Sequence, residues 1–151
     1  MTTNQNARID IYEGIMYIHL KAQEALAAGD LVTLSSAYAT SGSPYFAKCG
    51  TSGVPLGWAA EQVTAAGVAD YEPGGLVSHT AKVGDYVGVY MCGGVYNHYT
   101  SAAVGLYGQE LYAGTALAGK AASGASTNST KVGIVLEARD SNGYTKIKSY
   151  L

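Results

Sequence analysis

The chain has 151 residues with a formal net charge of −2, and 13% of its residues are charged. This length supports one domain with its own core, and a slightly acidic chain without a basic cluster excludes an electrostatic surface for nucleic acid. The chain contains no run of eighteen apolar residues, which excludes a membrane-spanning helix, so no membrane partner is expected. Typical soluble domains carry about 25% charged residues, and we therefore expect other chains to cover part of this surface.

The chain begins with a polar stretch, residues 1–8, and continues with an apolar segment that ends near Leu20. The beginning lacks the basic and apolar regions of a cleaved signal peptide, so we expect the product to stay in the cytoplasm that makes it or to leave by another route. The Ile and Tyr content of residues 9–20 favours an extended segment with a break at Gly14. This segment is expected to pair as an edge strand of its own domain or to add to the sheet of a neighbouring subunit.

The next segment, Lys21–Ala28, contains good helix formers but ends at Gly29. A segment this short is marginal as an isolated helix, so it forms one or two helical turns or a strand. Residues 1–26 are thus expected to form an N-terminal arm, and residues 27–151 a single β domain.

Two Gly-Asp pairs, Gly29-Asp30 and Gly84-Asp85, each precede an alternating pattern with Val two places after the Asp. Gly tolerates positive φ and the Asp side chain accepts hydrogen bonds from nearby backbone amides, so each pair predicts a turn. The period-2 pattern after it predicts a half-buried strand. Two such units suggest a pseudo-duplication, with sub-units at about residues 27–72 and 76–151.

Short strands at roughly ten-residue spacing, with no long helix, indicate an all-β barrel or sandwich. Asp140–Gly143 is a strong hairpin turn signal. The expected strands are 31–34, 45–48, 54–60, 76–80, 86–92, 110–114, 131–138 and 144–151.

Within the suggested duplication, Glu110–Gly114 resembles Pro44–Lys48, and residues 131–138 correspond to residues 54–60. Between them, residues 118–130 contain mostly Ala, Gly, Ser and Thr, a composition that predicts a flexible or edge-exposed loop.

Signatures of catalysis and of metal binding are missing from the sequence. The three histidines, His19, His79 and His98, have no metal-ligand spacing. The carboxylates are scattered singly, and turn capping accounts for Asp30 and Asp85. No nucleophile elbow, phosphate-binding loop or dinucleotide fingerprint is present. We therefore expect no enzymatic activity, no catalytic residue, no cofactor and no metal.

Cys49 and Cys92 are the only cysteines, and their spacing fits neither a zinc site nor a redox motif. Free buried thiols acting as small hydrophobic groups are the favoured interpretation. A disulfide between them stays open.

The segment Tyr86–Gln109 contains five tyrosines and no charged residue. Tyr suits interfaces that stay partly wet, so a subunit or partner contact is one interpretation. A sugar-binding platform that uses Tyr96, Tyr99 and Trp58 is a second, and core strands with a mobile loop are a third. With the apolar arm, the candidate partner-contact residues are Ile9, Ile11, Tyr12, Ile15, Met16, Tyr17, Tyr96, Tyr99 and Tyr107.

The order of these motifs resembles that of tailed-phage capsid decoration, or cement, proteins. The motifs are the two Gly-Asp strands at 28–34 and 83–89, the Val-Gly-Ile-Val-Leu-Glu strand that starts at Val132, and the basic closing strand Lys146–Lys148. The resemblance spans roughly residues 27–151. Residues 1–26 match no motif, and the Tyr-rich stretch from Gly93 to Gln109 departs from the pattern.

The resemblance implies a small β-barrel protein that forms a homotrimer. Such a protein is made in the host cytoplasm and ends on the outer capsid surface of the virion. There it contacts the major capsid protein, bridges neighbouring capsid subunits and stabilises the head. Two other classes stay open: a carbohydrate-binding or adhesion module of a phage or cell-surface assembly, and a small hydrolase, which needs an acid pair or a His-acid pair in one cleft.

Overall fold

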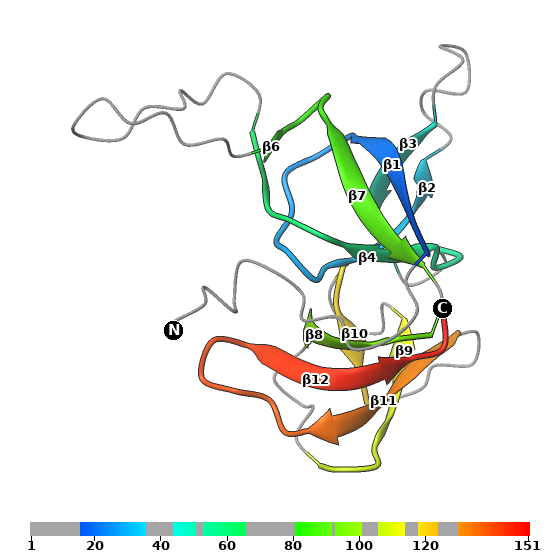
Figure 1. Ribbon diagram of the computed structural model, residues 1–151, viewed down its shortest axis with the longest axis vertical. Coiled ribbons are helices and arrows are strands. Elements are labelled where there is room, and N and C mark those ends of the chain that lie inside the picture. Colours follow the sequence, from blue (N-terminus) through cyan, green and yellow to red (C-terminus); the bar gives the residue numbers. More distant parts are fainter. Residues whose placement is uncertain are drawn as a thin grey trace, which may run out of the picture.

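The structure, a computed structural model, describes residues 16–35, 44–50, 53–65, 81–91, 93–100, 106–113, 118–123 and 130–151. All regular elements in these ranges are β-strands (Figure 1), which confirms the all-β prediction. Residues 21–28 were expected to form one or two helical turns or a strand, and the first two of them, Lys21 and Ala22, are the end of strand β1. The strands are β1 (Met16–Ala22), β2 (Leu31–Ser35), β3 (Tyr45–Lys48), β4 (Gly57–Ala59), β5 (Val63–Thr64), β6 (Ala81–Lys82), β7 (Tyr86–Met91), β8 (Val95–Tyr99), β9 (Glu110–Ala113), β10 (Ala121–Ala122), β11 (Lys131–Glu137) and β12 (Tyr144–Ser149).

Five strands close a first barrel in the order β1-β3-β2-β4-β7. β1 runs antiparallel to β7, from Met16 beside Met91 to Lys21 beside Tyr86, and parallel to β3 at Ala22. The C-terminal part of the expected arm is therefore a strand of its own domain, paired on both sides within the barrel. The interior is filled by Leu20, Ala22, Leu26, Val32, Phe46, Ala59, Val63, Val87 and Val89.

The other five-stranded sheet has the order β10-β9-β11-β12-β8 and lies below the barrel in Figure 1. Strands β8 to β12 correspond, in chain order, to β1, β2, β3, β4 and β7. Each pair of neighbouring strands in the barrel then has a counterpart in the second sheet with the same parallel or antiparallel direction. The parallel pair that closes the barrel recurs as a single parallel bridge between Thr100 and Ala121. The protein therefore contains two repeats of one topology: the first repeat, residues 16–91, and the second repeat, residues 93–151.

Equivalent turns confirm the correspondence at the level of single atoms. Gly29 precedes β2 with φ +80°, and Gly108 precedes β9 with φ +79°. The Gly29 N–H donates to the carbonyl of Ala59 at 2.8 Å, and the Gly108 N–H donates to the carbonyl of Val135 at 2.9 Å. In return, the N–H groups of Ala59 and Val135 each donate at 2.9 Å to the carbonyl of the residue after the glycine. Ala59 in β4 is therefore equivalent to Val135 in β11.

A second equivalent pair, Gly57 and Gly133, lies two residues before these positions. A Cβ added to Gly57 would lie 2.2 Å from the carbonyl oxygen of Tyr90, and one added to Gly133 would lie 2.6 Å from that of Lys148. Both contacts are with the neighbouring strand, β7 or β12, so each repeat needs a glycine at the same place. The predicted correspondence of residues 131–138 with residues 54–60 is confirmed here.

The boundary between the repeats differs from the expected one at residues 72–76, because β7 pairs with β1 and β4 of the first repeat. The two Gly-Asp turns consequently lie in the same repeat. The equivalent of the Gly84 turn is the hairpin before β12, where Gly143 has φ +93° against +97° for Gly84. Glu110–Ala113 likewise corresponds to β2 and not, as the sequence suggested, to β3.

A second hydrophobic core joins the two repeats. Leu31, Cys49 and Trp58 from the first repeat pack with Leu111, Ala113, Ala121, Val132, Val135 and Ile147 from the second. Ala121, which is 0% exposed, was expected in a flexible or edge-exposed loop. That expectation is wrong for Gly119, Ala121 and Ala122, which are buried because this small-residue segment fits between the repeats and pairs with β9.

Candidate interaction site

The candidate contact residues lie in separate parts of the fold. Met16 and Tyr17 are in β1, beside Met91 and Tyr90 of β7. Four further candidates lie outside the described residues: Ile9, Ile11, Tyr12 and Ile15. The structure therefore brings the first two into the barrel wall and gives no contact for the other four.

Tyr96 and Tyr99 are both in β8, where Tyr96 pairs with Ile147 and Tyr99 pairs with Tyr144 of β12. Strand positions an odd number of residues apart belong to opposite faces of a sheet. The two positions therefore do not share one face, as a common stacking platform would require.

Trp58, the third residue of the suggested sugar platform, is 0% exposed. Its indole N–H donates to the Ser149 hydroxyl oxygen at 2.9 Å, and its ring stacks on His98 with the ring centroids 3.5 Å apart. Trp58 therefore fills the junction between the repeats and is not available to a sugar.

His98 lies beneath Trp58 and is also 0% exposed. Burial lowers the pKa of His98 well below its ordinary value of 6.5, and a hydrogen bond with the backbone of Gly29 opposes that shift only in part. The imidazole is consequently neutral at physiological pH. It serves as a flat packing surface between the repeats.

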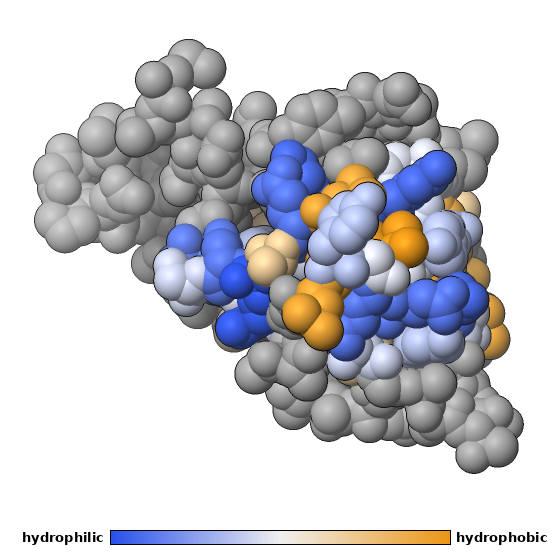
Figure 2. All heavy atoms as spheres, turned by 90° about the horizontal axis from the view of Figure 1, so that it is seen from below, coloured by the Kyte–Doolittle hydropathy of each residue, from blue (hydrophilic) through white to orange (hydrophobic). Residues whose placement is uncertain are grey.

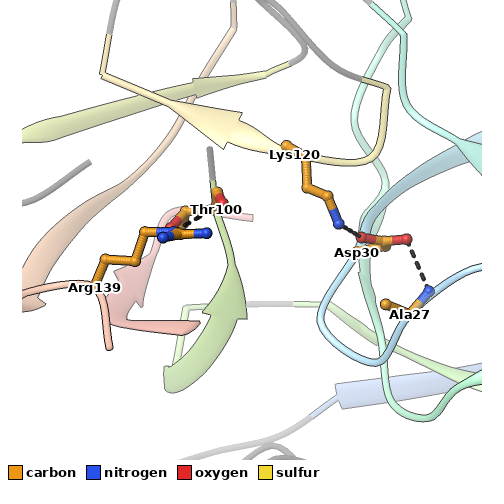
Figure 3. A network of polar contacts seen from close by, with 5 residues as sticks. All are labelled: Ala27, Asp30, Thr100, Lys120 and Arg139. Atoms are coloured by element: carbon orange, nitrogen blue, oxygen red, sulfur yellow. Dashed lines mark hydrogen bonds and ion pairs between the residues drawn. The ribbon is translucent and has the colours of Figure 1, made fainter. Parts of the chain in front are cut away.

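A buried ion pair also joins the repeats (Figure 3). The Lys120 ammonium donates to one carboxylate oxygen of Asp30 at 2.8 Å, while the other oxygen accepts the Ala27 N–H at 2.9 Å. Asp30 is 1% exposed. The predicted turn-capping role of Asp30 is thus confirmed, but the same carboxylate also holds the turn before β10. Sequence reasoning missed Lys120, because its segment has the composition of a loop.

Two further polar contacts stabilise the second repeat where the chain leaves β8, and Figure 3 shows the first of them. The Arg139 Nε donates to the carbonyl of Thr100 at 3.4 Å. The hydroxyls of Thr100 and Thr145 are hydrogen-bonded at 2.7 Å and buried. The chain just after β8 is thereby fixed beside β12.

The turn Leu106–Gln109 exposes one of the predicted contact residues, Tyr107. Tyr107 is 82% exposed, and its neighbour Leu106 is 72% exposed. The Gln109 N–H donates to the Leu106 carbonyl at 3.1 Å, and the Leu106 N–H donates to the Gln109 side-chain oxygen at 3.3 Å. Two large apolar groups therefore project from a turn whose backbone is held on both sides.

An apolar groove lies on the first repeat beside β2, and we call it the Leu34 groove. It has a volume of about 430 Å³ and is lined by Thr33, Leu34, Gly53, Val54, Pro55 and Leu56. Leu34 is 54% exposed and Val54 is 79% exposed. The Thr33 hydroxyl donates to the carbonyl of Val54 at 2.7 Å, which ties the two sides together. Sequence reasoning missed this surface, because its two sides are far apart in the chain, with Thr33 and Val54 separated by 21 positions.

The solvent face of the second repeat carries ion pairs. Lys131 and Tyr112 both contact the carboxylate of Glu110, and Lys146 pairs with Glu137 at 2.8 Å. The hydrogen bonds from Lys131 and Tyr112 lower the pKa of Glu110, and the same contact raises the pKa of Lys131. Figure 2 shows this end of the molecule, with hydrophobic residues standing singly among hydrophilic ones.

In the described ranges, no group of three or more His, Cys, Asp or Glu side chains is arranged to hold a metal ion. Cys49 is buried and free, and burial raises the pKa of its thiol to about 11. Cys92 lies outside the described residues. In the part of the chain that the structure describes, no helix is long and apolar enough to cross a membrane.

Comparison with known proteins gives a likeness of fold. No protein-family model matches the sequence, and no curated protein sequence matches it. Among solved structures, the chain is similar to the N base of the head fiber gp8.5 of bacteriophage phi29, with a TM-score of 0.51 and 14% sequence identity. The match covers 90% of this chain and 94% of that chain. The protein therefore shares the fold of that fiber base over 90% of its length.

Proposed function

We propose that this protein is a structural component of a tailed-phage head and binds the outer surface of the mature capsid. The observation that carries the proposal is the likeness to the phi29 head-fiber base, which extends over 90% of this chain and includes both repeats. The resemblance of the strand motifs to those of capsid decoration proteins supports the same placement independently. The proposed location is the virion, after synthesis in the host cytoplasm.

The role we propose is a mechanical one, without catalysis or a cofactor. A head protein of this kind bridges neighbouring major capsid subunits and stabilises the shell by burying surface, at about 25 cal/mol per Å² of apolar area before the cost of association. Repetition over a shell multiplies modest contacts through avidity. The proposed assembly is a homotrimer, which presents three identical contact surfaces together.

The structure offers features that suit such a role. The two repeats are held together by the Trp58–His98 stack and the Asp30–Lys120 ion pair, so the module can carry load between its ends. Exposed apolar groups lie at the Leu106–Gln109 turn and beside the Leu34 groove.

A second function follows from the same likeness: the module anchors an appendage on the head instead of sealing the shell. The likeness to a fiber base favours this alternative directly. In that case removing the protein removes the appendage but leaves the heat resistance of DNA-filled heads unchanged. For a decoration protein, the same removal makes the heads lose DNA at a lower temperature.

The proposal is tested with purified protein and heads of the phage that encodes it, prepared without this protein. We expect the protein to sediment with expanded, mature heads in a saturable manner and not with unexpanded proheads. Serum albumin in place of the protein serves as the control for trapping. Protein that stays in the supernatant with mature heads at every concentration would end the proposal.

A further inference from the structure

We propose that the Leu106–Gln109 turn of one subunit binds in the Leu34 groove of a second subunit, so that the subunits associate head to tail. The inference rests on the self-assembly proposed above and names the two surfaces that carry it. Three observations support it: the equivalent turn in the first repeat is buried in a contact, the exposed turn has an ordered backbone, and the described lining of the groove is uncharged.

The equivalent turn in the first repeat, Ala27–Asp30, is a docking element within the chain. Its Ala28 is 4% exposed and its Asp30 is 1% exposed. The next residue, Leu31, donates its N–H to the carbonyl of Gly119 at 2.8 Å, and Asp30 binds Lys120. The first repeat thus uses this turn to bind the second repeat.

The equivalent turn in the second repeat is exposed instead, with Leu106 at 72% and Tyr107 at 82%. Tyr107 takes the place of Ala28, and Gln109 takes the place of Asp30. Turns favour Gly, Pro, Asn, Asp and Ser, so the formation of this turn does not require Leu106 and Tyr107. Because the position that contacts another repeat in the first half carries a large exposed aromatic ring in the second, we assign the turn to a contact with another subunit.

The turn is well suited to binding because its backbone is already ordered. The Gly108 N–H donates to the carbonyl of Val135 at 2.9 Å, which fixes the turn on β11. A Tyr side chain adds a large contact area at low entropic cost, and little backbone freedom is lost on association. The projecting group is therefore a rigid apolar anchor.

The Leu34 groove matches this anchor in chemistry. No charged residue is among the described residues that line it, and none occurs in the Leu106–Gln109 turn, so these residues bring no unpaired charge into the contact. The Leu56 N–H donates to the carbonyl of Val32 at 2.8 Å, which holds the floor of the groove on β2. The groove accepts an apolar group without a conformational change of its strands.

The two surfaces lie in different repeats, so each chain offers one of each. In Figure 1 the stretch that leads into β9 runs along the lower end of the molecule, whereas β2 belongs to the upper barrel. A contact between unlike surfaces is heterologous, and it generates a ring when the rotation closes. A closed ring of three subunits gives the proposed homotrimer.

Sedimentation velocity of the purified full chain tests the contact. Tyr107→Ser removes the anchor and Val54→Ser weakens the groove, and both sites are exposed, so the fold is retained. Tyr86→Ser is the matched control, because Tyr86 is 58% exposed and belongs to neither surface. We expect the first two variants to associate at least about tenfold more weakly than wild type, and the control to associate like wild type.

Mixing the two weakened variants distinguishes a head-to-tail contact from a symmetric one. The Val54→Ser subunit keeps its anchor and the Tyr107→Ser subunit keeps its groove, so the mixture has one intact contact. We expect each variant alone to be monomeric and an equimolar mixture to form dimers. A mixture that stays monomeric, a wild type that is monomeric at all concentrations, or a Tyr107→Ser variant that associates like wild type would each overturn the inference.

Sedimentation of the same variants with phage heads separates this inference from the proposed function. If wild-type protein binds heads but does not associate through these surfaces, only the inference fails. If it associates through them and does not bind heads, the proposed function fails and the contact stands.

Discussion

Replacing Gly57 by Ala places a methyl group where the barrel has no room for it. The Cβ would lie 2.2 Å from the Tyr90 carbonyl oxygen and 3.0 Å from a Val89 methyl, and real Cβ atoms essentially never come within 3.0 Å of another group. The Tyr90 oxygen belongs to the backbone of β7, which pairs with Trp58 of β4. Strands β4 and β7 must therefore move apart, which disrupts the closed barrel.

Overpacking in a core typically costs about 1–3 kcal/mol, and we expect Gly57→Ala to reach the upper end, because backbone atoms cannot rotate away. Gly133→Ala should cost less, about 1–2 kcal/mol. Its contact, with Lys148, is longer at 2.6 Å, and β11 already shifts register beside it. Gly50→Ala is the control, since nothing lies within 4 Å of its added Cβ. This change should leave stability within about 0.5 kcal/mol.

The assay is urea denaturation followed by far-UV circular dichroism and by the fluorescence of Trp58, the single tryptophan. Because Trp58 lies at the junction, its emission reports on whether the repeats separate before they unfold. A Gly57→Ala protein as stable as Gly50→Ala would refute the close approach of β4 and β7. Loss of stability at Gly57 with none at Gly133 would refute the structural equivalence of the repeats.

Three further predictions concern the junction. Lys120→Met removes the cation that faces buried Asp30; breaking a buried pair in this way costs about 3–5 kcal/mol, and thermal denaturation should show a larger loss than for Lys131→Met, whose ion pair is exposed. Burial lowers the pKa of His98 in the folded protein, so below about pH 6.5 the unfolded state binds the extra proton and stability should fall with pH by up to about 1.4 kcal/mol per unit. Urea denaturation between pH 5.5 and 7.5 checks this, and His98→Phe should flatten the profile. Finally, the Cys49 thiol, whose pKa burial raises to about 11, should not react with a maleimide at pH 7.5 in a Cys92→Ser background until urea unfolds the protein; rapid labelling of the native protein would contradict its burial.

The local structure of the turns could be predicted from the sequence, because a turn depends on residues close together in the chain. Gly29 and Gly84 have positive φ, as expected. Asp30 and Asp85 each accept a backbone N–H from three residues earlier at 2.9 Å. The strands after both turns are β2 and β7, close to the expected bounds.

The pairing of the repeats could not be predicted from those two motifs. The turn needs a glycine at its third position and a side-chain oxygen at its fourth, and Gln109 supplies that oxygen as well as an Asp does. The structural equivalent of Gly29-Asp30 is therefore Gly108-Gln109. The similar pair Gly84-Asp85 lies in the first repeat, together with Gly29-Asp30. Only the strand pairing of the structure distinguishes an equivalent turn from a merely similar one.

The junction between the repeats could not be predicted from the sequence pattern either. Trp58 could equally have been an exposed stacking face, and the low-complexity composition around Lys120 and Ala121 favoured an exposed loop. Small side chains are suited to a tight interface as well as to a flexible linker. The choice is decided by Asp30 and His98, which are far from these segments in the sequence and close to them in the fold.

The most direct test of the central claim is cryo-electron microscopy of heads from the phage that encodes this protein, compared with heads from which the gene has been deleted. The account predicts density outside the wild-type shell that fits the two repeats, contacts the major capsid protein and is missing from the deletion heads. Two maps without such a difference would contradict the assignment to the head.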